Sequence, residues 1–211
     1  MKFENINRPI SSFRSLALVN FIMISTWIIV AGQETKREFE QNISKDDFPP
    51  MILHAMQPIL TESKRTKYIE EYDDTLHTYE VKTKWNDRWL SIEFFADYSL
   101  MDIEEIYDFN NLDGKVKPVI ETYLSDSFRK FKITRTQIQF SSINKRESIE
   151  RSILHFKNGD MEHFQRRYEI VARVISHNKK TIGSFEFLFN RNGELIRWRR
   201  EKKMLTDNVL F

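Results

Sequence analysis

Three short patterns occur in the first half of the chain and recur, in the same order, in the second half. The first copy has Pro-Met-Ile at 50–52, Tyr-Glu-Val at 79–81 and Ser-Ile-Glu-Phe at 91–94. The second copy has Pro-Val-Ile at 118–120, Tyr-Glu-Ile at 168–170 and Ser-Phe-Glu-Phe at 184–187. The second copy is longer, and added length belongs in connections between elements. The sequence therefore predicts a duplicated structural unit.

In the first copy the hydrophobic period changes from that of a helix to that of strands. A helix is predicted from Asp47, with Pro58 expected to kink it or end it early. Its apolar face consists of Met51, Ile52, Ala55, Met56 and Ile59. From Lys67 onward the side chains alternate, which predicts strands over 68–72, 77–85 and 90–95. Residues 100–109 are predicted as a fourth strand, although their pattern also fits a helix.

The second copy follows the same scheme with clearer turns. A helical stripe runs from Val116 to Leu124, and extended segments are predicted over 133–140, 168–174, 185–189 and 194–200. The Asn-Gly pair at 192–193 is typical of a tight hairpin turn. Residues 143–163 have no counterpart in the first copy, and they fit either a short helix with a turn or an extended hairpin.

These elements predict an α+β fold of two repeats, at 46–112 and 113–205, with an insertion at 143–163. Each repeat is expected to be a helix packed on an antiparallel sheet of about four strands, because helix and sheet each have one apolar side to cover. Two such sheets side by side would form one broad concave face, with the helices behind it.

The amino terminus has the order of charged and apolar residues that is typical of a secretory signal. Residues 1–32 are predicted to be a signal peptide, followed by a flexible lead-in at 33–45, which makes the mature protein periplasmic or secreted. If the segment were not cleaved, it would be the one part of the protein in contact with a membrane. The chain has no cysteine, so stability must come from packing rather than disulfides.

The charges of the mature chain divide between its halves. Residues 33–114 carry 9 basic and 19 acidic side chains, whereas residues 115–211 carry 21 basic and 11 acidic ones. This asymmetry could attract the halves to each other or orient a charged partner. Nucleic acid is not expected as a partner, because the acidic half would repel phosphate.

The second copy resembles PepSY-like repeats and the tandem-repeat proteins shaped like the beta-lactamase inhibitor protein. The resemblance lies in a Tyr-Glu-Val-like strand, an apolar strand and an Asx-rich turn with glycine, at Arg167–Ile170, Ser184–Phe187 and Asn190–Leu195. It extends over about residues 46–203, and it departs from the family pattern at Asp97–Ser99, which lacks the glycine. The resemblance implies an exported binding or inhibitory module without catalytic residues.

The residues offer little catalytic chemistry, so no enzyme, cofactor or metal is predicted. The five histidines are scattered; His155 and His163 flank a turn and could converge, but a solvated loop is the preferred interpretation. Glu80 with Glu93, and Glu169 with Glu186, could form paired carboxylates, yet cross-strand ion pairs on a wet sheet surface are expected instead. The acidic group at 70–74 lacks the spacing of a calcium loop.

Aromatic and arginine side chains are predicted where a solvated sheet face would not require them. The predicted partner-binding residues are Trp89, Phe95, Trp198, Arg197 and Arg199, since Trp and Arg dominate interface energies. The predicted function is binding, in the cell envelope, of a protein or peptide partner through the sheet face, which could inhibit that partner. The alternatives are a small-molecule-binding or hydrolytic domain with a pocket between helix and sheet, and a structural envelope component.

Overall fold

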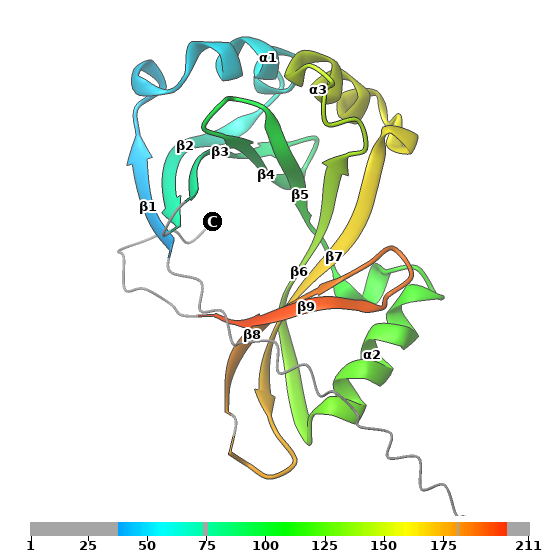
Figure 1. Cartoon of the computed structure of the whole chain (residues 1–211). Helices are drawn as coiled ribbons and strands as arrows, with labels where there is room; N and C mark the ends of the chain where they lie inside the picture. The colour runs from blue at the N-terminus through cyan, green and yellow to red at the C-terminus, as the bar shows by residue number, and fades with distance from the viewer. Residues whose placement is uncertain (1–37, 74–75, 181, 202–211) are drawn as a thin grey trace, which may run out of the picture. The chain divides into compact units, whose positions relative to one another are not determined.

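The computed structural model describes residues 38–73, 76–180 and 182–201 (Figure 1). The chain divides into two compact units, residues 1–32 and 33–211, and the described residues all belong to the second. The predicted signal peptide and the last residues of the predicted second repeat lie outside the described residues. Within the described ranges, no helix is long and apolar enough to cross a membrane.

Nine strands form one antiparallel sheet, and strands that are neighbours in the sequence are also neighbours in the sheet. The strands are β1 (Glu38–Ile43), β2 (Lys64–Asp73), β3 (Leu76–Trp85), β4 (Arg88–Phe95), β5 (Leu100–Ile106), β6 (Lys130–Ser142), β7 (Phe164–Ile175), β8 (Ile182–Phe189) and β9 (Leu195–Arg200). Because each strand pairs with the next, the connections are hairpins or segments that contain a helix.

Three α-helices and three 3-10 turns connect these strands. The helices are α1 (Pro50–Leu60), α2 (Val116–Ser127) and α3 (Ile149–Asn158), and the turns are η1 (Lys45–Asp47), η2 (Phe109–Asn111) and η3 (Met161–His163). Pro50 starts α1, where its missing N–H is not needed, and Pro58 lies two residues before the helix ends. Helix α3 has Ser148 as its N-cap and ends at Gly159, whose φ of 82° favours glycine.

The predicted helices and strands are confirmed at nearly all their positions. Helix α1 and strands β2 to β4 match the pattern of the first copy, and α2 with β6 to β9 matches the second. The segment at 100–109 forms strand β5 rather than a helix. In the insertion at 143–163, the helix with a turn is the arrangement adopted, as α3 and η3.

The prediction of two modules, each with its own four-stranded sheet, is wrong. Strand β5 pairs with β6 through four positions, from Ile103 with Phe140 to Ile106 with Gln137, so the strands of both halves make a single sheet. A strand left at the edge of its own sheet would expose unpaired N–H and C=O groups, and this pairing satisfies them. The prediction of a flexible lead-in at 33–45 is also wrong over Glu38–Ile43, which pairs with β2 as strand β1.

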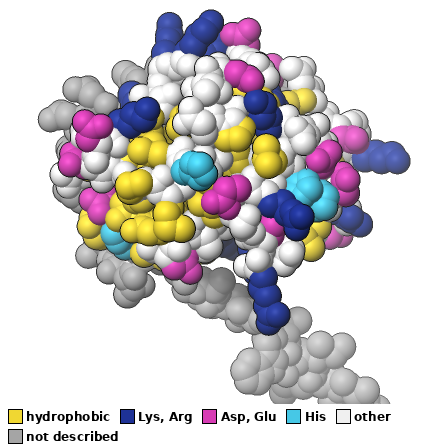
Figure 2. All heavy atoms as spheres, turned by 90° about the horizontal axis from the view of Figure 1, so that it is seen from above, with side chains coloured by type: hydrophobic (Ala, Val, Ile, Leu, Met, Phe, Trp, Pro, Cys, Tyr) yellow, Lys and Arg dark blue, Asp and Glu magenta, His cyan; other side chains and the backbone are white. Residues whose placement is uncertain are grey.

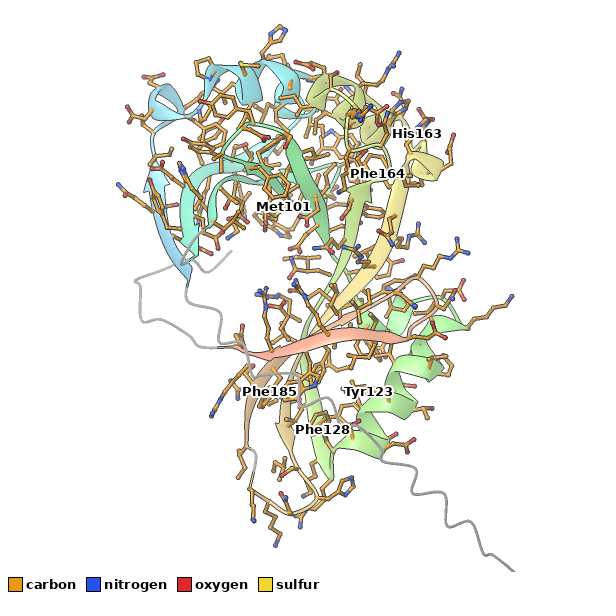
Figure 3. All side chains as sticks on the ribbon, viewed as in Figure 1. Met101, Tyr123, Phe128, His163, Phe164 and Phe185 are labelled. Carbon is orange, nitrogen blue, oxygen red and sulfur yellow. The ribbon has the colours of Figure 1, made fainter. Side chains whose placement is uncertain are left out.

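One hydrophobic core lies between the sheet and the helices. At one end, Tyr123 of α2 and the adjacent Phe128 pack with edge contacts on Phe187, close to Phe185 (Figure 3). At the other end, Phe156 of α3 lies 6.2 Å from Trp85 of β3, measured between ring centroids. A helix inserted in the second half of the chain therefore covers strands of the first half, which is why the halves do not form separate cores.

Helices α1 and α3 lie side by side over the sheet (Figure 1). Lys157 of α3 donates to the carbonyl of Pro58 at 2.7 Å and to Glu62 at 2.8 Å. Seen from above, this side presents hydrophobic side chains interspersed with charged residues and histidines (Figure 2). Met51 and Leu154 are among the exposed hydrophobic side chains of these two helices.

Replacing Phe156 tests the single core. Phe156 is 1% exposed and also contacts Phe140 and Phe164. We expect Phe156→Ala to lower the free energy of unfolding by about 3–5 kcal/mol, because the lost ring leaves a cavity. Urea denaturation followed by tryptophan fluorescence measures it, and a single transition is expected for both proteins.

The control is Leu154→Ala on the same helix, where the side chain is 45% exposed. A surface change of this kind is expected to stay within about 0.5 kcal/mol of the unchanged protein. Two separate transitions, or equal effects of the two substitutions, would contradict one shared core.

Candidate functional site

The face of the sheet opposite the helices is hollowed into a cavity of about 470 Å³. Side chains alternate along each strand, so the residues between the core positions point to this face. Glu40 of β1 and Arg199 of β9 both line the cavity, which means that the sheet curls enough to bring its first and last strands around one space. Met101 of β5, labelled in Figure 3, also lines it.

The lining is strongly charged, and its charges divide by origin. Seven carboxylate residues and four cationic residues line the cavity. Six of the acids come from β1 to β5, and they are Glu40, Glu71, Glu80, Glu93, Asp102 and Glu104. Three of the cations come from β6 and β9, and they are Arg135, Arg197 and Arg199. The opposite charges of the two halves of the sequence therefore meet across this cavity.

Lys82 is the cation on the acidic side. Its ammonium group lies 3.0 Å from Glu80 and 3.4 Å from Glu40, and Glu80 also accepts a hydrogen bond from Ser91. Burial opposes the charged form of Lys82, but the charges of Glu80 and Glu40 outweigh burial and raise the pKa of Lys82 above its ordinary value. Lys82 therefore stays charged at neutral pH.

The floor of the cavity is a network of two carboxylates and two amides on β5 and β6. Gln139 donates from Nε2 to Asp102 at 2.8 Å and to Glu104 at 3.3 Å, and Gln137 donates to Glu104 at 2.5 Å. Carboxylates only accept hydrogen bonds, so the amide nitrogens must face them. The amide oxygens of Gln137 and Gln139 are buried, and no described residue donates a hydrogen bond to them.

Two arginines on the basic side are held by buried acids. Arg199 contacts Glu186 through Nε at 2.8 Å and through an Nη atom at 2.7 Å, and both nitrogens meet the same oxygen, Oε1. Arg135 lies 3.3 Å from Glu169. Burial opposes the charge of Arg135, yet Glu169 and Glu104 outweigh it and raise the pKa of Arg135. Arg197 is exposed and makes no ion pair with any described residue.

Four of the five predicted partner-binding residues line this one cavity: Trp89, Phe95, Arg197 and Arg199. Trp198 lies on the other face, opposite Phe187 in the sheet register and 5.5 Å from Phe185 between ring centroids. Successive side chains of a strand point to opposite faces, so the order Arg197, Trp198, Arg199 along β9 places Trp198 on the face away from the two arginines. The floor residues Asp102, Glu104, Gln137 and Gln139 were not predicted as site residues.

The expectation of a wet sheet surface is wrong for the glutamate pairs. Glu80, Glu169 and Glu186 are buried, with Glu80 only 2% exposed. Glu169 and Glu186 form cross-strand ion pairs, with Arg135 and Arg199, whereas Glu80 pairs with Lys82 of its own strand. Curling of the sheet buries the three carboxylates. Sequence alternation indicates which face a side chain occupies and carries no information on the curvature of that face.

Carboxylates in the cavity come close enough together to raise the question of a cation. Glu40, Glu71 and Glu80 form one group and Glu93, Asp102 and Glu104 another, each with oxygens within 4.8 Å of one another. Lys82 lies against the first group, and glutamine amides bond to the second. These contacts already supply positive or donor groups, so acidity alone assigns no metal here.

A second hollow, of about 970 Å³, lies between the start of α2 and the sheet. Val116, Phe140, Phe164 and Tyr168 are among its lining residues. The alternative of a hydrolytic domain with a pocket between helix and sheet would be favoured by His155 or His163 beside a carboxylate in such a pocket. Neither histidine lines this hollow.

Comparison with solved structures finds a BLIP-like protein from Bacteroides fragilis, with 13% sequence identity and a TM-score of 0.44. The match covers 77% of this chain and 92% of that protein. It is a distant likeness to a BLIP-like fold and gives no support to the PepSY-like part of the sequence resemblance. No protein-family model matches the chain, and no curated protein matches it.

Replacing Lys82 tests the charge balance of the cavity. We expect Lys82→Met to lower the free energy of unfolding at pH 7 by about 3–5 kcal/mol, because Glu80 is left as a buried charge without its cation. The double variant Lys82→Met/Glu80→Gln should recover much of the loss. Since the pKa of Lys82 is raised, its contribution is present at neutral pH and is lost only as the pH rises through that elevated pKa.

Lys84→Met is the matched control on the same strand. Lys84 pairs with Asp87, whose side chain is almost fully exposed, and such surface pairs contribute about 0–1 kcal/mol. Chemical denaturation of the three variants measures the difference, and equal losses for Lys82→Met and Lys84→Met would contradict a buried charge network.

Proposed function

We propose that this chain is a non-catalytic binding protein, and that its cavity captures a segment of a protein or peptide partner through a basic side chain of that partner. The observation that carries the proposal is the excess of acceptors on the cavity floor. The signal-like amino terminus supports a periplasmic or secreted location for this binding.

The floor calls for a donor with positive charge. The oxygens of Gln137 and Gln139 lie beside Asp102 and Glu104, and a buried acceptor left without a hydrogen bond costs about 1–3 kcal/mol. A lysine ammonium or arginine guanidinium has several donors and no acceptor. Such a group would be attracted by the carboxylates around the cavity, and a small shift of the buried amides would let it donate to their oxygens.

The sides of the cavity suit the aliphatic part of such a side chain. Trp89, Phe95 and Met101 line the cavity together with the acids. The methylene stems of lysine and arginine pack on apolar surface while the charged head reaches polar groups. Aromatic rings also attract a cation placed over their faces. A basic side chain can therefore use both kinds of lining residue.

The basic side of the cavity suits the backbone of the same segment. Arg197 is exposed at the cavity and carries donors that no described residue uses. A peptide supplies carbonyl oxygens along its length, and charged hydrogen bonds of this kind contribute about 1.5–3 kcal/mol each. An extended peptide thus offers a cation to one side of the cavity and acceptors to the other.

Selection from a library of displayed random peptides tests the proposal. Peptides retained by the protein should share one lysine or arginine, and replacing that residue by norleucine should weaken binding at least tenfold, about 1.4 kcal/mol. Trp89→Ala should weaken binding of the selected peptide about 30-fold, in the range of an interface hot spot. Fluorescence anisotropy with labelled peptide measures each affinity.

Arg197→Ala and Arg200→Ala form a matched pair on β9. Arg197 lines the cavity, whereas Arg200 pairs with Phe185 on the opposite face. We expect the first to weaken binding and the second to leave it unchanged, with circular dichroism confirming that both variants fold. Selected peptides without a preference for basic residues, or equal effects of the two substitutions, would refute the proposal.

A further inference from the structure

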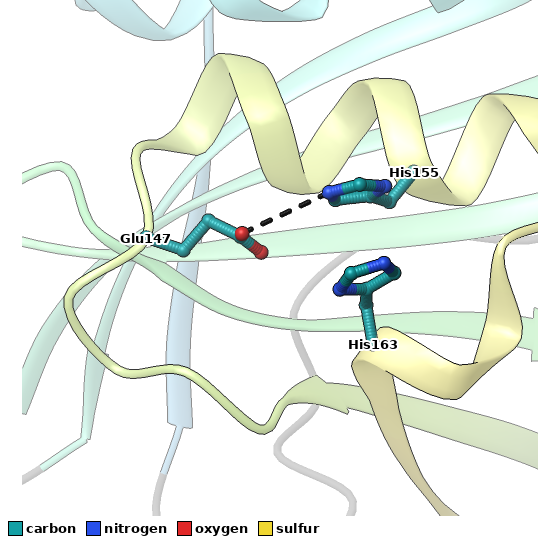
Figure 4. A group of neighbouring side chains, drawn as sticks. All are labelled: Glu147, His155 and His163. Atoms are coloured by element: carbon teal, nitrogen blue, oxygen red, sulfur yellow. Dashed lines mark ion pairs between the residues drawn. The ribbon is translucent and has the colours of Figure 1, made fainter.

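Two histidines and a glutamate converge beside α3, away from the cavity. Glu147 precedes the helix, His155 lies in its last turn and His163 ends η3 (Figure 4). Their ligand atoms all lie within 4.8 Å of one another. Among the described residues, three groups of side chains come this close, and this is the one that contains histidine.

The chain reversal after α3 creates the pair of histidines. Gly159 takes the left-handed conformation that ends the helix, and Asp160 donates its N–H to the carbonyl of His155 at 2.9 Å. The chain then returns, so that the rings of His155 and His163 stack with centroids 3.6 Å apart and planes 13° apart. Ile143 of the neighbouring segment bonds to the carbonyl of His163, which fixes the position of η3.

Asp160 orients one of the rings. Its carboxylate lies 3.2 Å from Nδ1 of His155. Because a carboxylate only accepts, Nδ1 is the donor in this contact, and Nε2 is the ring nitrogen left to bind a metal. Nε2 points toward Glu147, whose oxygen Oε1 lies 3.8 Å away (Figure 4). Carboxylates hold metal-binding histidines in this way, through the ring nitrogen that does not contact the metal.

Glu147 is held in place by its other oxygen. Ser152 donates to Oε2 at 3.3 Å, which leaves Oε1 facing the two rings. The distance of 3.8 Å between Oε1 and Nε2 is too long for a hydrogen bond. Zinc binds nitrogen and carboxylate oxygen at about 2.0–2.2 Å, so two ligand atoms on one ion lie about 3–4 Å apart. The spacing of Oε1 and Nε2 falls in this range. The stacked rings point their nitrogen lone pairs along parallel lines, so the partly exposed ring of His163 must turn out of the stack to share an ion with His155.

We propose that Glu147, His155 and His163 bind one divalent transition-metal ion of the zinc class. Imidazole nitrogen and carboxylate oxygen are ligands that such ions favour. His163 is partly exposed, with 40% of its side chain accessible, so solvent can reach the ion and complete its coordination. From sequence, a solvated loop was the preferred interpretation of these histidines, and the proposal takes up the alternative that they converge.

Isothermal titration of the metal-free full chain with zinc chloride tests the proposal. We expect uptake of one zinc ion per chain and a higher melting temperature when zinc is added, because an ion bound to the folded state stabilises it. His155→Ala and His163→Ala should each abolish this uptake. Asp160→Asn, which disturbs only the orientation of His155, should weaken it by about 10–100-fold.

His54→Ala is the control, because His54 is an exposed histidine on α1 outside the group. It should bind zinc as the unchanged protein does. Cobalt provides a second readout that needs no variant, since its visible absorption reports coordination by nitrogen and oxygen. No zinc uptake by the unchanged protein, equal uptake by His155→Ala and His163→Ala, or cobalt absorption identical to that of free cobalt in buffer would overturn the site.

Discussion

The pairing of β5 with β6 is the interaction on which the rest of this structure depends. Without it, the strands of the first and second halves would end in two unpaired edges. With it, they form one sheet, and the helix inserted after β6 can cover the strands of the first half. The same register sets Glu104 opposite Gln139, so the junction of the halves is also the floor of the cavity.

The two faces of this sheet differ in the kind of side chain that they bury. One face is packed with aromatic and aliphatic side chains under three helices, and that burial supplies the driving force for folding. The other face buries carboxylates and pairs them with Lys82, Arg135 and Arg199. Buried ion pairs contribute little net stability, because desolvation offsets attraction. Under the proposed function, these charges serve to recognise a basic side chain of the partner.

Local periodicity predicted most of the elements and could not predict how they join. Leu90, Ile92 and Phe94 alternate as a half-buried strand must, and the Asn-Gly turn before β9 has its own chemistry, so both were found from sequence. The pairing of Ile103 with Phe140 joins residues from separate copies, and nothing in either local pattern encodes it.

The candidate site shows the same division between local and long-range information. Arg197, Arg199, Trp89 and Phe95 were singled out by residue type, and the curl of the sheet brings them to one cavity. Trp198 was grouped with its neighbours although strand alternation puts it on the other face. The convergence of His155 with His163 follows from the turn at Gly159, while Glu147 joins them only through the packing of the whole insertion.

Native-state hydrogen exchange is the most direct measurement of the central claim, that one sheet runs through both halves. The account predicts that backbone amides of β5 and β6 at their shared border exchange only through global unfolding, with the same opening free energy as amides of β3 and β8. Rapid exchange at the β5–β6 border, or different opening free energies for the two halves, would contradict it.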